Sequence, residues 1–224
     1  AARLRLAIER RETVAVFGDY DVDGITSACL VTSFLRAKGL DCEPYIPDRM
    51  EEGYGLNLAA MDTIKARGAS LIVTVDCGIT AVEEVAYASG LGIDVIITDH
   101  HECKEEIPAA VAVVDPHRKD CPYPFKDLAG VGVALKLVMA LGGEKRYRAL
   151  FQEYADLAAV GTVADVMKLL GENRTIVRVG LNHLKKTRRR GLYALMVEAG
   201  TLNRAITSTT VVNSLSPQIG RAHV

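Results

Sequence analysis

The stretch TVAVFGDYDVDG, residues 13–24, joins an apolar run to an acidic turn and decides the fold. Its first part, Thr13–Phe17, is typical of a strand that is covered on both faces. Three carboxylates at alternate positions, Asp19, Asp21 and Asp23, follow just before a helical pattern. In open α/β sheets, ligands bind at this carboxyl end of the strands. The stretch therefore predicts a parallel sheet with a polar ligand site where its strands end.

Four further apolar runs alternate with helical patterns along the chain. The expected strands are Thr13–Phe17, Cys42–Ile46, Leu71–Val75, Ile93–Thr98 and Val111–Val114, and the expected helices are Ile25–Lys38, Leu56–Arg67, Ala81–Ser89 and Val131–Leu141. This alternation predicts right-handed βαβ units, hence an α/β fold with a mainly parallel sheet and helices on both faces. From about Lys145 onward the pattern is helical, so a helical C-terminal segment should follow.

The composition of the 224 residues is that of an ordinary globular protein, with 49% hydrophobic and 25% charged residues. Its five cysteines form no CxxC pair, which favours reduced thiols in the cytoplasm over disulfides or a zinc ribbon. Nothing resembles a signal peptide or a membrane-spanning run. The formal net charge of −1 counts modestly against nucleic-acid binding, although the stretch 174–190 carries only basic charges.

Acidic residues and histidines recur after later apolar runs. Asp76 follows one expected strand, Asp99-His100-His101 follows the next, and Asp165 lies within an apolar helical pattern. Each has a simpler explanation by itself: Asp76 as a helix cap, His100 as a core histidine, Asp165 in an ion pair. Together they predict a crevice whose carboxylates need cations, because unpaired acids are costly in apolar surroundings.

The ligand types narrow the choice of ion. Carboxylates with one or two imidazoles suit Mn²⁺ or Mg²⁺, and their number exceeds what one ion needs, so we expect two ions. An EF-hand calcium loop is excluded, because the twelfth position counted from Asp19 is Leu30 instead of a glutamate.

These motifs resemble those of the DHH phosphoesterases, and among them the RecJ type of single-strand-specific exonuclease. The matching motifs are VAVFGDYDVDGIT (14–26), YIPDRMEEGYGLN (45–57), TVDCGIT (74–80), ITDHHE (97–102), VVDPHR (113–118), LAGVGVALKLV (128–138) and GTVADVMKL (161–169). The second and sixth favour the RecJ type over related pyrophosphatases and small-oligonucleotide hydrolases.

The resemblance implies roles for individual residues. The implied metal ligands are Asp19, Asp21, Asp23, Asp76, His100 and Asp165. The implied catalytic residues are Asp76, which would bridge both ions, His101, which would contact the phosphate, and Asp99, which would orient a neighbouring group. Arg49 and Tyr54 would lie near the nucleotide, although Tyr54 could equally belong to a simple loop-to-helix turn.

The resemblance also implies a function: 5′–3′ degradation of single-stranded DNA in recombination and repair, in the bacterial cytosol or nucleoid. A single-strand-binding protein and a helicase would be partners, and no membrane would be involved. The alternatives are hydrolysis of small nucleotides, oligonucleotides or cyclic dinucleotides, and a non-catalytic DNA-binding relative. We expect a catalytic domain at 1–170, a helical link toward a missing accessory domain at 171–218, and an artefactual tail at 219–224.

Overall fold

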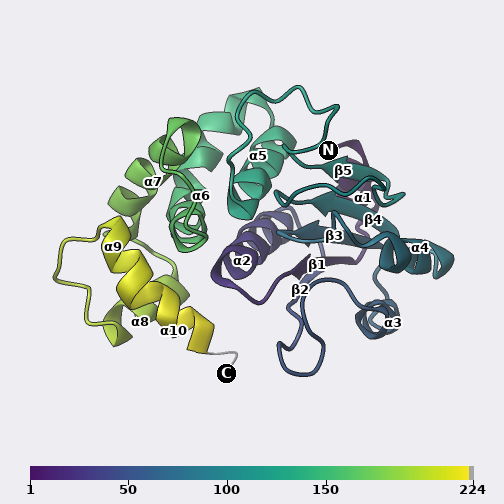
Figure 1. Cartoon of the computed structure of the whole chain (residues 1–224), viewed down its shortest axis with the longest axis horizontal. Helices are drawn as coiled ribbons and strands as arrows, with labels where there is room; N and C mark the ends of the chain where they lie inside the picture. Colours follow the sequence, from purple (N-terminus) through teal and green to yellow (C-terminus); the bar gives the residue numbers. More distant parts are fainter. Residues whose placement is uncertain (222–224) are drawn as a thin grey trace.

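The computed structural model describes residues 1–221, and a five-stranded parallel sheet lies in one half of it, on the right in Figure 1. The strands are β1 (Val14–Gly18), β2 (Cys42–Tyr45), β3 (Leu71–Val75), β4 (Asp94–Thr98) and β5 (Ala112–Val114). Their order is β2-β1-β3-β4-β5, and every neighbouring pair is parallel. The predicted α/β fold is confirmed, and no strand boundary differs from the expected one by more than one residue.

Side chains of each central strand alternate between two apolar cores. In β1, Val14 and Val16 belong to the core beneath α2 (Val22–Ala37) and α5 (Gly130–Gly142). Ala15 and Phe17 point to the opposite core, which α3 (Leu58–Ala66) and α4 (Val82–Gly90) cover. The sheet is therefore buried on both faces, which explains why its strands lack a polar alternation.

The order of the strands reverses at the centre of the sheet. The chain passes from β1 to β2 on one side, and then returns to place β3, β4 and β5 on the other side. Between β1 and β3 the connecting segments diverge to opposite faces, so a crevice forms beyond their carboxyl ends. Asp19 follows β1 and Asp76 follows β3, so both lie at this crevice.

One helix was missing from the prediction. The helix α1 (Ala2–Arg10) precedes β1, and its Leu4 and Ala7 are fully buried in the core beneath α2 and α5. Arg3 fixes it further by contacts with Glu12 (2.6 Å) and Asp94 (2.5 Å). The signal in the sequence was the spacing of Leu4 and Ala7, which lie three positions apart, as on one face of a helix.

Helices alone make up the C-terminal part, as predicted, and they lie beyond α2 and α5 (Figure 1). They are α6 (Glu144–Ala164), α7 (Gly171–Leu184), α8 (Arg190–Glu198), α9 (Ser208–Thr210), a π-helical turn (Val211–Leu215) and α10 (Ser216–Arg221). Within residues 1–221, no helix is long and apolar enough to cross a membrane. The expected tail begins inside α10, and its residues 222–224 lie outside the described residues.

Candidate metal centre

The acidic turn after β1 places three carboxylates in different surroundings. Asp19 is buried, and its Oδ1 has no hydrogen-bond partner among the described residues. Asp21 is exposed and caps α2, since its Oδ1 accepts a hydrogen bond from Gly24 N (2.8 Å). Asp23 lies buried in the first turn of α2. Because the chain changes from strand to helix within this turn, Asp19 and Asp23 are buried and Asp21 stays exposed at the rim.

Asp23 is held by a helix that lies more than a hundred residues further along the chain. Its Oδ2 accepts a hydrogen bond from Gly130 N (2.7 Å), and its Oδ1 accepts one from Val131 N (2.9 Å). These are free N–H groups at the start of α5, where Ala129 offers no capping side chain. The carboxylate therefore caps α5 from another element, and the helix dipole stabilises its charge.

Asp76 follows β3 in a backbone conformation that most residues avoid. Its φ is 60°, in the left-handed region where aspartate and asparagine are the most tolerated side chains after glycine. Its N–H donates to Thr98 O (3.0 Å), which fixes the turn against β4. The helix α4 begins after Ala81, so Asp76 is not its cap and that simpler explanation is wrong.

Two glycines make room for these acids. A Cβ on Gly130 would lie 2.4 Å from Asp76 Oδ1, and a Cβ on Gly161 would lie 2.6 Å from Asp23 Oδ1. Any side chain at either position would displace a carboxylate. The helices α5 and α6 therefore approach the acids through their backbones, which also explains the first glycine of the LAGVG motif and the glycine of the GTVAD motif.

His100 brings the acids from separate elements together. Its Nε2 lies 3.0 Å from Asp76 Oδ1, 3.7 Å from Asp165 Oδ2 and 3.9 Å from Asp23 Oδ2. Asp165 is the residue that ends α6. The residues that could hold a metal form two overlapping groups, Asp76-His100-His101 and Asp23-His100-Asp165, whose ligand atoms lie within 4.8 Å of one another.

The centre contains ligand atoms that lack partners. Among residues 1–221, no hydrogen bond is made by these buried atoms: Asp19 Oδ1, Asp76 Oδ1, His100 Nε2 and Asp165 Oδ2. The 3.0 Å separation of His100 Nε2 from Asp76 Oδ1 lacks the alignment of a hydrogen bond. Buried polar atoms without partners are costly, whereas divalent cations would satisfy those of Asp76, His100 and Asp165, so this set of donors fits a metal. Asp19 and Asp21 belong to neither of the two groups.

Burial also opposes the negative charge of these acids. Burial raises the pKa of Asp19 to about 6. Burial, and then the charge of Asp76, raise the pKa of Asp23 well above its usual value. Burial and the neighbouring acids do the same to the pKa of Asp76. Protons or cations must therefore compensate the cluster, and a cation would do so at neutral pH.

Asp99 holds the second histidine of the DHH motif. Its Oδ1 accepts hydrogen bonds from the His101 ring at Nδ1 (2.7 Å) and from the N–H of His100 (2.7 Å), while its Oδ2 accepts one from Ile79 N (2.9 Å). The hydrogen bond with Asp99 raises the pKa of His101. His101 is thereby oriented with Nε2 toward the crevice, where the Tyr54 hydroxyl lies 3.3 Å away.

Aromatic and basic side chains line the rim. The guanidinium of Arg49 lies over the Tyr20 ring, 5.3 Å from its centroid. Tyr20 and Tyr54 pack edge to face with centroids 6.2 Å apart. Tyr54 also precedes α3 by a few residues, so it belongs to a loop-to-helix turn and reaches the centre as well. Tyr20 was not predicted; its position between Asp19 and Asp21 was the only signal.

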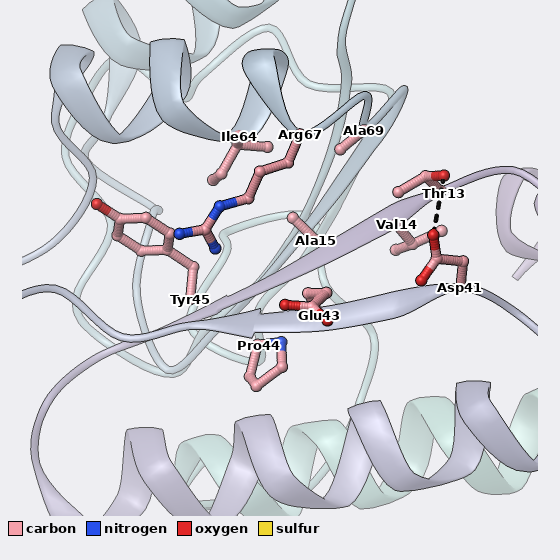
Figure 2. A pocket seen from close by; sticks show the side chains of 10 residues that line it. All are labelled: Thr13, Val14, Ala15, Asp41, Glu43, Pro44, Tyr45, Ile64, Arg67 and Ala69. Carbon is pink, nitrogen blue, oxygen red and sulfur yellow. Dashed lines mark hydrogen bonds between the residues drawn. The ribbon is translucent and has the colours of Figure 1, made fainter.

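A separate cavity extends from the amino end of β1 along β2 to Tyr45, the last residue of β2 (Figure 2). It measures about 220 Å³ and is lined by residues of β1, β2 and α3, including Thr13 at the amino end of β1. Figure 2 shows the Arg67 guanidinium beside the Tyr45 ring, 5.8 Å from its centroid. None of the residues that line this cavity belongs to the metal centre.

Comparison with known proteins identifies relatives of the whole chain. The single-stranded-DNA-specific exonuclease RecJ of Bacillus subtilis is 47% identical over 98% of this chain and 27% of its own length. The RecJ of Escherichia coli is 39% identical over 93% of this chain and 38% of its own length. The chain thus spans about a quarter to two fifths of these relatives.

Solved structures of RecJ proteins also resemble this chain. The crystal structure of exonuclease RecJ bound to manganese matches 99% of this chain and 56% of that chain, with a TM-score of 0.88 and 36% identity. That of RecJ from Thermus thermophilus in complex with Mn²⁺ has a TM-score of 0.78 and 33% identity over 97% of this chain and 31% of its own. The family model described as DHH family, N-terminal domain, matches residues 13–162. The chain therefore belongs to the DHH family.

Proposed function

We propose that this chain is the catalytic part of a two-metal exonuclease that hydrolyses the phosphodiester bonds of single-stranded DNA in the 5′–3′ direction. RecJ relatives of known specificity support the proposal, as do RecJ structures that contain Mn²⁺ or Mg²⁺. The observation that carries it is the set of four buried ligand atoms without partners at the switch point of the sheet.

The acids and His100 would hold the ions. Asp23, His100 and Asp165 form one group of suitable geometry, and Asp76 with both histidines forms the other. Asp21, with Asp19 beside it, would bind the ion other than that of Asp23, and Asp76 would bridge the two ions. Bound divalent ions would reverse the negative potential of the crevice and activate a water molecule for attack on phosphorus.

Residues of the chain itself would bind and orient the substrate. His101 is held by Asp99 as a donor on Nδ1, and its Nε2 faces the crevice, where a protonated imidazole would stabilise a phosphate oxygen. Tyr54 occupies that position now, so a phosphate must displace its hydroxyl. Arg49 on the Tyr20 ring offers a cation and an aromatic surface beside the same crevice.

Digestion of end-labelled oligonucleotides tests the proposal. With Mn²⁺, the chain should release mononucleotides from single strands, leave duplexes intact and stop when a chelator is added. The variant Asp76→Asn serves as the inactive control, because asparagine tolerates the same backbone conformation. Exclusive hydrolysis of dinucleotides or cyclic dinucleotides would favour the alternative function, and binding without hydrolysis would favour a non-catalytic protein.

The cellular setting belongs to the proposal as well. We infer action in the bacterial cytosol or nucleoid, together with a single-strand-binding protein and a helicase that would deliver single strands. The free thiols of the five cysteines are consistent with a reducing compartment. Stimulation of digestion by a helicase on duplex substrates would test the partnership.

A further inference from the structure

A tight turn after β5 lies directly behind the DHH motif. The two are adjacent because β5 pairs with β4, and the ladder continues past the strand ends where Asp99 N donates to Val114 O (3.0 Å). The turn comprises Asp115–Arg118, the end of the VVDPHR motif. Neither the metal centre nor the rim described above uses this turn.

Two side chains fix the turn in place. Asp115 is buried, and its Oδ1 accepts a hydrogen bond from His117 N (2.7 Å). Arg118 Nη1 donates to Val113 O (2.6 Å), back onto the strand that precedes the turn. Pro116 restricts the backbone between them. These contacts hold the backbone at His117 in a fixed position.

The imidazole of His117 contacts the backbone of His100. Its Nδ1 lies 2.6 Å from His100 O. A carbonyl oxygen can only accept, so Nδ1 carries the proton and donates it. The remaining nitrogen, Nε2, lies 4.0 Å from the carboxylate of Glu102, which is largely exposed. Nδ1 also lies 3.8 Å from the buried Asp115 Oδ1, but its contact with the His100 carbonyl is much shorter.

His100 has unusual need of such support. A metal-ligating histidine is commonly oriented by a hydrogen bond to its second ring nitrogen. Among residues 1–221, neither ring nitrogen of His100 makes a hydrogen bond. Its backbone is instead held on both sides, since its N–H donates to Asp99 Oδ1 (2.7 Å) and its carbonyl accepts from His117.

We propose that His117 is a positioning residue for the metal centre: by binding the His100 carbonyl, it fixes the direction in which the His100 imidazole meets Asp76 and Asp165. The inference rests on the proposed metal site. Without the hydrogen bond, the peptide after His100 can rotate, and Nε2 leaves the point where it lies 3.0 Å from Asp76 Oδ1. Ion affinity would fall although no ligand has been removed.

Three substitutions of His117 distinguish the effect of losing the hydrogen bond from the effect of losing the volume of the ring. His117→Leu removes the donor. His117→Asn keeps one, because its amide nitrogen is attached to Cγ as Nδ1 is in histidine. His117→Asp matches the asparagine in size but presents only oxygens to the carbonyl. Its extra negative charge would by itself attract a cation, so a loss of affinity in this variant must come from geometry.

The measurement is the affinity for Mn²⁺ alone, by calorimetric titration of the whole 224-residue chain, together with the melting temperature without metal. His117→Leu should bind Mn²⁺ about 10–100-fold more weakly, the range found for groups that orient metal ligands. His117→Asn should recover most of the affinity, and His117→Asp should not. The control Glu102→Gln alters the exposed carboxylate beside Nε2 and should leave the affinity within about twofold of the original.

The outcomes are distinguishable. An asparagine variant that binds Mn²⁺ about 10-fold or more weakly than the unsubstituted chain would overturn the role of His117, and this comparison holds even if the leucine variant does not fold. Unchanged affinity in a folded leucine variant would overturn it too. Failure of the unsubstituted chain to bind Mn²⁺ would instead overturn the proposed function. Weak binding by leucine and aspartate variants with rescue by asparagine would establish the hydrogen bond as the cause.

Discussion

Replacing Asp165 by asparagine should stabilise the metal-free protein. The ligand oxygens of Asp23 and Asp165 lie within 4.8 Å of each other. Two unit charges at that distance would repel by about 3 kcal/mol at an effective dielectric constant of 20. Burial raises the pKa of Asp23, so its protonation removes part of this repulsion from the metal-free protein. The amide has the same shape, and Asp165 Oδ2 has no hydrogen bond to lose. Because Asp165 is partly exposed and solvent screens its charge, we expect a gain of about 1–2 kcal/mol in the free energy of unfolding.

Thermal unfolding with and without Mn²⁺ provides the assay. The gain should raise the melting temperature of the metal-free variant by about 2–8 °C. For the unsubstituted chain, Mn²⁺ at one hundred times its dissociation constant should add about 2.7 kcal/mol, or roughly 5–11 °C. The variant should lose most of this second increase, because it lacks a ligand.

Asp127→Asn is the matched control. Its carboxylate lies outside the metal centre, 4.0 Å from Lys168 Nζ, with 48% of its side chain exposed. We expect a change of less than about 0.5 kcal/mol and an undiminished response to Mn²⁺. A metal-free Asp165→Asn protein that melts below the original, or one that keeps the full response to Mn²⁺, would refute the reasoning.

Further expected results concern activity, packing and pH. Asp76→Asn should abolish Mn²⁺-dependent digestion of end-labelled single strands while the melting temperature stays at or above the original. Gly161→Ala should lower the free energy of unfolding in urea by about 1–3 kcal/mol, because its Cβ would lie 2.4 Å from a threonine oxygen of α2. Gly191→Ala meets nothing within 4 Å and should be neutral or slightly stabilising. The Arg3 hydrogen bond lowers the pKa of Glu12, so its contribution to stability is complete above the unfolded pKa of about 4.5 and is lost as pH falls through the lower folded value. Glu12→Gln should therefore lose less stability than the original protein when the pH is lowered from 5 to 3.

Local patterns were enough to predict the sheet and its acidic turns. Apolar runs such as Leu71–Val75 are short, bounded by polar residues and repeated, so strands and their ends follow from the sequence. Because parallel strands end at one side of a sheet, the approach of Asp76 to the turn after β1 follows as well. The roles of individual ligands stay predictions until a metal-bound form is measured.

Long-range hydrogen bonds could not be predicted in the same way. The bonds from Gly130 and Val131 to Asp23 join segments that share no local pattern, and the GVG stretch by itself indicates only a weak nucleotide-binding motif. The contact of His117 with the His100 carbonyl depends on how β5 lies beside β4. Tertiary geometry decides such pairs, whereas sequence periodicity describes single elements.

The bond between Asp23 and the start of α5 also sets an order of assembly. Its two partners are 107 and 108 positions away, so the intervening chain must close a long loop before either bond can form. During synthesis, Asp23 therefore stays hydrated until α5 has left the ribosome and docked on the sheet. The candidate metal centre also contains Asp165 at the end of α6, so it is complete only after the first 165 residues have folded together.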